Sequence, residues 1–250
     1  MRKIGLLACG VCLFLAWGLY GRGQDGEPRA IIDKAIKAHG GAKKLSAIKA
    51  IQMKGKGKIY VPMEASFTAE ISSQPPDKHN LSVDLEINNM NFKFFQVFDG
   101  KKGWQGITGM VKELDADEVK EAKQQGHVGE VESLIVLKDK SYKLSALGES
   151  KVGDHDAVGV QVTKKGWRDV NLFFDKKTHL LLKAEYRALD PNKQEVTQET
   201  LFLDYKDVGG FKTPGRMVIN NDGKKFLEME ITETTPMETP LDASVFAKPE

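Results

Sequence analysis

The sequence predicts a mainly β protein of the α+β type: a single curled antiparallel sheet, or half-barrel, of about ten or eleven strands that wraps two or three helices. Three observations support this. Residues 51–87 alternate apolar and polar side chains with period two, as half-buried antiparallel strands do. Residues 158–231 repeat the pattern, and turn sequences such as Asp99-Gly100 and Asn221-Asp222-Gly223 separate the segments.

Residues 1–23 have the pattern of a secretory signal peptide. Arg2 and Lys3 form a short basic region, and an apolar run of 17 residues from Ile4 to Tyr20 follows. We therefore expect cleavage after Gly23 and export of the mature chain. Two alternatives stay open: a lipoprotein cleavage site at Cys9, and an uncleaved anchor, because the run reaches the shortest spanning length of ~17 residues.

The composition of the mature chain excludes several classes of function. The whole chain has 37 basic and 35 acidic residues, and three basic residues lie in residues 1–23, so residues 24–250 carry a net charge of −1. Such a chain has no bulk electrostatic attraction to nucleic acid. Both cysteines, Cys9 and Cys12, lie in the leader, which excludes disulfides and cysteine-bound metal from the mature domain. No segment after residue 28 resembles a linker, so we expect one domain over residues 24–250 with no stable membrane span.

The mature chain opens with a predicted helix. Pro28 suits the first turn, and Ile32, Ala35 and Ile36 form an apolar stripe at helical spacing. Gly40-Gly41 ends this helix, and a second helical turn over residues 44–48 leads into the sheet.

The period then changes from 3.6 to two. We expect strands at residues 51–61, 65–71, 81–87 and 92–98, and again at 158–162, 170–174, 180–186, 197–205, 217–220 and 226–231. Along residues 180–186, simple alternation places Leu182, Ala184 and Tyr186 on one face and Leu181 and Lys183 on the other.

Between the two sets of strands lies the other helical stretch. Asp115 is a predicted N-cap with Glu118 three residues on, which is a capping-box pattern. We expect this helix to end near Gly126. Its apolar stripe is weak, and we predict that the segment Ala116–Gln125 is a movable lid. The more apolar segment Val131–Leu137 predicts a second, buried helix.

The area of the concave face exceeds what the predicted helices can readily cover. One helix is ~10–12 Å across and strands lie ~4.8 Å apart, so a helix covers about two or three strands. Either the sheet of ten strands closes into a barrel on itself, or part of its concave face stays open, and such apolar clefts suit lipid-like ligands. The side chains that we expect to line such a cleft are Phe67, Val83, Leu85, Phe94, Trp104, Leu134, Leu172, Phe174 and Leu182.

The order of these elements resembles the LolA-like superfamily, and more closely the exported outer-membrane lipoprotein-sorting-like proteins. The matching stretches are Ile31–Ile51, Val97–Trp104, Phe173–Lys183 and Leu241–Pro249. The resemblance covers nearly the whole mature chain. It implies a half-barrel around helices with an apolar cavity for acyl chains or a hydrophobic partner. The chain departs from the carrier pattern in lacking an arginine in residues 48–72.

Signatures of catalysis are missing from the sequence. It has no G-x-S-x-G elbow, P-loop or G-x-G-x-x-G, and its histidines do not show zinc-site spacing. His155, in Gly153–Asp156, could belong to a metal or acid–base cluster, but a solvated turn explains it as well and is our preferred interpretation. Gly55-Lys56-Gly57-Lys58 lies in a strand, where glycine relieves crowding. We therefore predict no enzyme, no cofactor and no metal.

Three functions remain as hypotheses. The first is a periplasmic or envelope binding protein that holds a lipid, an acyl chain or a lipoprotein-like hydrophobic ligand. The second is an envelope lipid sensor or scaffold with a protein partner and no transported ligand. The third, a hydrolase of lipids or polysaccharides, requires a convergence of side chains that spacing does not reveal.

Overall fold

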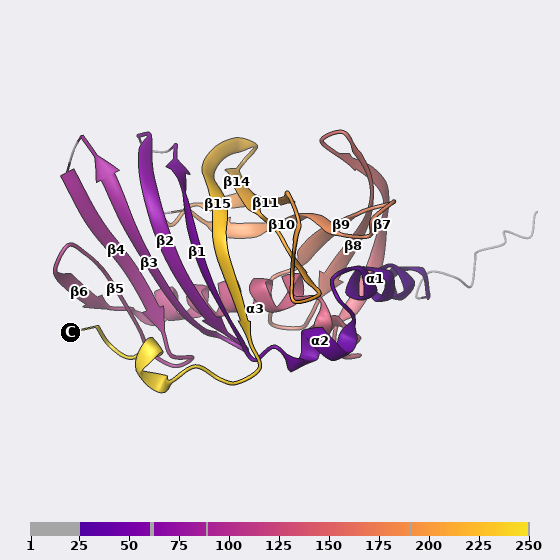
Figure 1. The fold of residues 1–250 in the computed structure, drawn as a ribbon, viewed down its shortest axis with the longest axis horizontal. Coiled ribbons are helices and arrows are strands. Elements are labelled where there is room, and N and C mark those ends of the chain that lie inside the picture. Colours follow the sequence, from indigo (N-terminus) through magenta and orange to yellow (C-terminus); the bar gives the residue numbers. More distant parts are fainter. Residues whose placement is uncertain (1–25, 61–62, 89, 191, 250) are drawn as a thin grey trace, which may run out of the picture.

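The computed structural model describes residues 26–60, 63–88, 90–190 and 192–249, so the predicted signal peptide lies outside the described residues. Most of the described chain is strand (Figure 1). The strands are β1 (Ala50–Ile59), β2 (Ala65–Gln74), β3 (Lys78–Ile87), β4 (Met90–Phe98), β5 (Gly103–Ile107), β6 (Met110–Glu113), β7 (Lys143–Val152), β8 (His155–Thr163), β9 (Val170–Asp175), β10 (Leu181–Leu189), β11 (Glu195–Leu203), β12 (Lys206–Val208), β13 (Phe211–Thr213), β14 (Arg216–Asn221) and β15 (Lys224–Met237).

Thirteen of these strands form one sheet in the order β6-β5-β4-β3-β2-β1-β15-β14-β11-β10-β9-β8-β7, and every neighbouring pair is antiparallel. The chain starts at the centre with β1, runs outward to the edge strand β6, and crosses to the other edge at β7. It then returns inward until β15 pairs with β1. The predicted single antiparallel sheet around helices is confirmed, with more strands than expected.

Five helical segments accompany the sheet. They are α1 (Gly26–Ala38), α2 (Ala42–Ala47), α3 (Ala116–Glu132) and the 3₁₀ turns η1 (Ile135–Lys138) and η2 (Ala243–Phe246). The expected stripe on α1 is buried, since Ile32, Ala35 and Ile36 expose 4% or less of their surface. The helix α3 is the crossover between the two edges of the sheet and lies across its face (Figure 1).

The predicted end of α3 near Gly126 is wrong, and so is the separate helix at residues 131–137. α3 continues through Gly126 because the next turns carry His127, Val128 and Val131, which are buried. The helix ends at Glu132, and Leu134 adopts a left-handed backbone with φ of 67° before η1 begins.

The two halves of the concave face are covered differently. Residues of α1, α3 and η1 pack on β7–β11 in one large core that contains Leu172, Phe174 and Leu181. Over β1–β4 the buried residues form a smaller cluster, with Phe67 and Val83 packed against Met229 and Ile231 of β15. Helices therefore fill one half of the curled sheet and leave the other half partly open.

Candidate functional site: a cavity beneath one half of the sheet

A cavity of about 1480 Å³ lies between α3 and the open half of the sheet. It exists because α3 turns its buried side chains, Val128 and Val131, toward the filled half. On its other sides, α3 makes only a short apolar contact with this half, where Ala122 and Val119 pack against Phe98 of β4 and Leu114. The cavity occupies the space between the two surfaces, and each surface forms one of its walls.

The sheet wall is apolar. It is formed by the inward side chains of successive strands, among them Met53 on β1, Ile71 on β2, Leu81 on β3 and Phe94 on β4. The register pairs Met53 with Ile71 and Ile71 with Leu81, so these side chains lie in one row across the sheet. Such a row offers a continuous hydrophobic surface for an apolar ligand.

The helix wall is polar and acidic. Glu118, Glu121, Gln125 and Glu132 recur at intervals of three, four and seven residues and therefore share one face of α3. Glu118 accepts hydrogen bonds from Lys112 Nζ at 3.0 Å, and Arg168 makes a bidentate pair with Glu121 at 3.0 and 2.8 Å.

Two glycines on α3 also border the cavity. A Cβ at Gly126 would lie 3.2 Å from Asp77 Cα, so the missing side chain permits close approach of the β2–β3 turn. A Cβ at Gly129 would meet no atom within 4 Å. Gly129 therefore marks open space on the helix wall.

Glu132 differs from the other glutamates of this wall. Within the described chain, no hydrogen bond or ion pair to its carboxyl is present. Burial raises its pKa from the ordinary 4.5 to about 8. The carboxyl is enclosed by protein but keeps surface open to the cavity, since Glu132 is one of the residues that line it.

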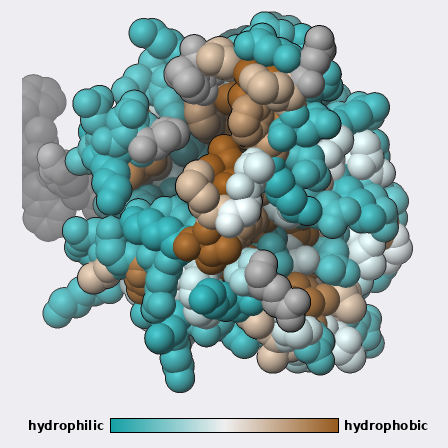
Figure 2. All heavy atoms as spheres, turned by 90° about the vertical axis from the view of Figure 1, so that its left-hand side faces the viewer, coloured by the Kyte–Doolittle hydropathy of each residue, from teal (hydrophilic) through white to brown (hydrophobic). Residues whose placement is uncertain are grey.

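The rim of the cavity at the β5–β6 edge is also apolar. Ile107, Met110 and Val111 line the cavity and expose 38%, 67% and 39% of their surface. Figure 2 views this side of the molecule and shows apolar side chains gathered in a depression surrounded by hydrophilic residues. The apolar interior thus continues to the surface.

Phe94 is the one of the nine predicted site residues that lines the cavity. Phe67, Val83 and Leu85 lie on the same concave face, in the cluster beside the cavity. The remaining predicted residues of the concave face, Leu134, Leu172 and Phe174, are fully buried in the filled half.

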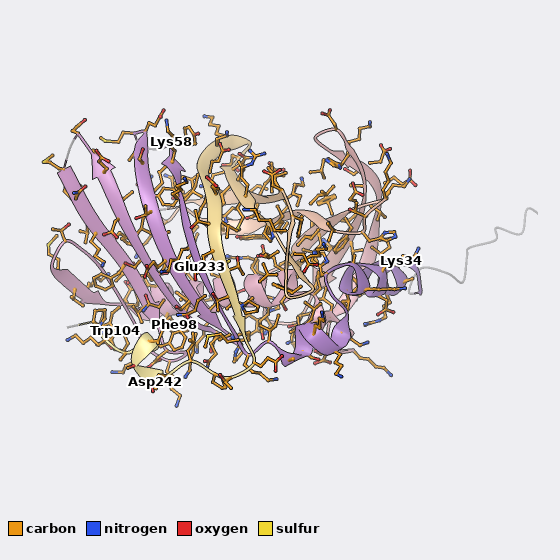
Figure 3. The ribbon with its side chains drawn as sticks, in the orientation of Figure 1. Lys34, Lys58, Phe98, Trp104, Glu233 and Asp242 are labelled. Carbon is orange, nitrogen blue, oxygen red and sulfur yellow. The ribbon has the colours of Figure 1, made fainter. Side chains whose placement is uncertain are left out.

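Leu182 and Trp104 lie on the convex face. A β-bulge between Leu181 and Lys183 breaks the expected alternation, so Leu181 and Ala184 face the core while Leu182 packs outside on Phe173. Trp104 pairs with Val97, next to the cavity-lining pair Gln96 and Gln105, so alternation turns it outward. Figure 3 shows Trp104 at the η2 end of the sheet.

Most of the residues that line the cavity were not predicted from the sequence. Met53, Ile71 and Leu81 belong to the apolar faces it recognised, but nothing in the pattern says which end of each strand lies beneath α3. The signal for the helix wall was present: the weak apolar stripe of residues 116–125 is what remains when one face of a helix borders a cavity instead of a core.

No group of three or more His, Cys, Asp or Glu that could hold a metal lies in the described part of the chain. His155, suspected in the sequence, is exposed and its Nδ1 donates a 2.8 Å hydrogen bond to Asp175 Oδ2. His39 lines the cavity, but its ring contacts Ala35 O at 2.8 Å and Tyr205 Oη at 3.5 Å. These contacts give both histidines a structural explanation.

Comparison with known proteins bears on the fold. No protein-family model matches the sequence, and no curated protein is similar to it. Among solved structures, a LolA superfamily protein from Nitrosomonas europaea matches over 88% of this chain and 97% of its own, with a TM-score of 0.53 and 11% identity. The chain has the LolA-like fold.

Two further structures share the LolA-like fold with this chain. A DUF1329 family protein from Desulfovibrio piger is 14% identical, with a TM-score of 0.54 over 88% of this chain and 97% of its own. A domain assigned to outer membrane lipoprotein sorting, from Vibrio parahaemolyticus, is 13% identical, with a TM-score of 0.51 over 86% and 97%. The resemblance expected from the sequence is confirmed at the level of the fold.

The described helices were also compared with the requirements of a membrane span. Within residues 26–249, apart from the undescribed positions, no helix combines the length and the apolar character that a crossing needs.

Proposed function

We propose that this chain is an exported binding protein of the periplasm or cell envelope that holds a lipid, an acyl chain or a lipoprotein-like hydrophobic ligand. The observation that carries the proposal is the cavity of about 1480 Å³, with its continuous apolar wall of Met53, Ile71, Leu81 and Phe94. Ligand pockets typically measure ~300–1,000 Å³, so this cavity has room for a long chain. Burying a methylene on such a wall contributes about 0.8 kcal/mol.

The LolA-like fold supports the same proposal by analogy. One structure with this fold is assigned to outer membrane lipoprotein sorting, which is a property of that protein. We propose a related class of ligand here, and an envelope location. Fold likeness alone does not specify a ligand, so the cavity carries the argument.

We propose no catalytic activity. Glu118 and Glu121, two of the carboxylates of the helix wall, are engaged in ion pairs with Lys112 and Arg168. Such pairs hold these two side chains in place and make them poor bases for proton transfer.

An envelope sensor or scaffold is a second candidate. It is favoured by the exposed apolar rim of Ile107, Met110 and Val111, which lies on and beside the edge strand β6. An edge strand offers unpaired backbone groups as well, so a protein segment could pair there.

Native mass spectrometry of the purified protein, followed by organic extraction, tests the proposal. We expect a mass shift that matches an extracted lipid or acylated molecule. A ligand-free mass, together with no response to a fluorescent fatty-acid probe, would contradict a lipid-binding function and favour the scaffold candidate. The probe also distinguishes an empty cavity from one that lost its ligand during purification.

A further inference from the structure

Glu132 is the carboxylate of the helix wall that lacks a partner. Glu118 and Glu121 lie on the same face of α3, and basic side chains neutralise both. Glu132 lies 14 residues beyond Glu118, or about 21 Å along the helix at 1.5 Å per residue. Lys112, the partner of Glu118, belongs to the apolar rim strand β6, so Glu132 lies at the end of the helix wall that is far from this rim.

The groups that face Glu132 from other elements do not compensate its charge. Burial raises the pKa values of Tyr186 on β10 and of Tyr205, and the negative charge of Glu132 raises both further. Both hydroxyls are already engaged: Tyr205 Oη donates to Leu181 O at 2.8 Å, and Tyr186 Oη accepts from Gln198 Nε2 at 2.6 Å. His39, which contacts Tyr205, has its pKa lowered by burial and is therefore neutral at pH 7.

The lining as a whole has an excess of acidic groups. Seven acidic and four lysine side chains border the cavity. The acidic ones are Asp77, Asp117, Glu118, Glu121, Glu130, Glu132 and Asp190, and the lysines are Lys78, Lys112, Lys193 and Lys212. The field inside therefore favours a cation over an anion.

We propose that the cavity takes cationic amphiphiles, whose protonated amine pairs with Glu132 while the apolar chain lies on the wall of Met53, Ile71, Leu81 and Phe94. This inference rests on the proposed function and narrows its ligand class. A buried carboxylate is costly without a partner, and an ammonium supplies both an opposite charge and hydrogen-bond donors.

A prediction about pH follows from the same arrangement. The ammonium binds the ionised carboxylate, and burial keeps Glu132 mostly protonated below its pKa of about 8. An alkyl amine stays protonated up to pH ~10, as lysine does. The preference for the amine therefore rises between pH 6 and pH 8, and binding at pH 7 releases a proton.

The test is calorimetric titration of the purified protein with decylamine, decanol and decanoic acid, which share one chain length. We expect decylamine to bind at least tenfold more tightly than decanol at pH 7, with proton release measured in buffers of different ionisation enthalpy. Glu132→Gln should abolish the preference for decylamine over decanol and the proton release. Glu70→Gln removes the same charge on an exposed site of β2 and should leave both intact.

The outcomes separate the inference from the function on which it rests. If decanol and decanoic acid bind but decylamine binds no better, or if Glu132→Gln keeps the preference, the role of Glu132 is wrong and the apolar-ligand function stands. If none of the three binds, the cavity is not a site for alkyl chains and both proposals fail.

Discussion

At the scale of single residues, Asp175 closes the turn between β9 and β10. Its Oδ1 accepts hydrogen bonds from the backbone N–H groups of Lys177 and Thr178 at 2.8 and 2.6 Å, and Oδ2 contacts His155. Burial acts to raise the pKa of Asp175, but these hydrogen bonds outweigh it and lower the pKa to about 2. The ionised carboxylate therefore stabilises the β9–β10 turn at one end of the filled half.

Removing this carboxylate should destabilise the fold in a pH-dependent way. We expect Asp175→Ala to lower the free energy of unfolding by about 2 kcal/mol at pH 7, since hydrogen bonds to charged groups contribute ~1.5–3 kcal/mol each. The contribution is present above pH ~4 and is lost as pH falls toward 2, because the folded pKa lies below the ordinary 3.8. Urea denaturation at pH 7 and pH 3 measures it.

Asp154→Ala is the matched control, because Asp154 is an exposed acid in the adjacent β7–β8 turn. A loss from Asp175→Ala that is no larger than that from Asp154→Ala would show that the turn does not depend on the carboxylate.

Glu132 should affect stability with the opposite sign. Its folded pKa of about 8 lies above the ordinary 4.5, so the folded state binds more protons between these values. Stability is greatest below pH ~4.5 and falls as pH rises through 8. One pKa unit corresponds to ~1.4 kcal/mol, and water in the cavity screens part of the shift, so we expect about 2 kcal/mol. Denaturation midpoints at pH 5 and pH 9 should converge in Glu132→Gln, and an unchanged difference would contradict burial of the carboxyl.

At the scale of elements, the two halves of the continuous helix α3 are held by different contacts. Its first half is held by the capping box of Asp115 and Glu118 and by the bidentate pair of Arg168 with Glu121, and it buries one apolar side chain, Ala122, against Phe98 and Leu114. Its second half carries His127, Val128 and Val131 in the core. The lid predicted for residues 116–125 therefore corresponds to the less buried half of a continuous helix, and Arg168 is what fastens it.

Removing the pair of Arg168 with Glu121 should increase the mobility of only the first half of α3. We expect Arg168→Ala to speed amide exchange of residues 116–125 about tenfold, since a partly buried bidentate pair contributes more than the ~0–1 kcal/mol of an exposed one. Exchange of residues 127–132 should not change. Hydrogen-exchange mass spectrometry resolves the two segments.

Arg187→Ala serves as the control, because the pair of Arg187 with Glu195 is exposed and lies on the β10–β11 hairpin. Equal acceleration along all of α3 in Arg168→Ala would mean that the helix opens as one unit and has no separate lid.

The sequence predicts elements well where burial alternates and poorly where it does not. The strands β1–β3 follow period two because one face of each meets the interior. The edge strand β7 was missed because most of Lys143–Val152 is exposed, so it carries no alternation. The bulge at Leu181 reverses the face of Leu182, and α3 continues past Gly126 because His127, Val128 and Val131 are buried. Both features depend on tertiary contacts that no local pattern records.

At the scale of the whole molecule, the cavity follows from the distribution of helices. One curled sheet of thirteen strands presents more concave surface than α1, α3 and η1 cover, and they cover β7–β11. The sequence left two outcomes open, a sheet closed into a barrel or a partly uncovered concave face, and the structure has the second. No pattern in the sequence indicates that β1–β6 is the uncovered half.

The most direct test of the central claim is to fill the cavity from its helix wall. Gly129→Leu places a side chain where a Cβ meets no atom within 4 Å, and it removes a helical glycine that costs ~0.8–1 kcal/mol, so the fold should be retained or stabilised. Ala116→Leu introduces the same side chain at an exposed site on α3 that does not line the cavity. The measurement is the Kd for decanol by calorimetry: we predict a weakening of tenfold or more in Gly129→Leu and none in Ala116→Leu, whereas equal affinity in all three proteins would contradict ligand binding in this cavity.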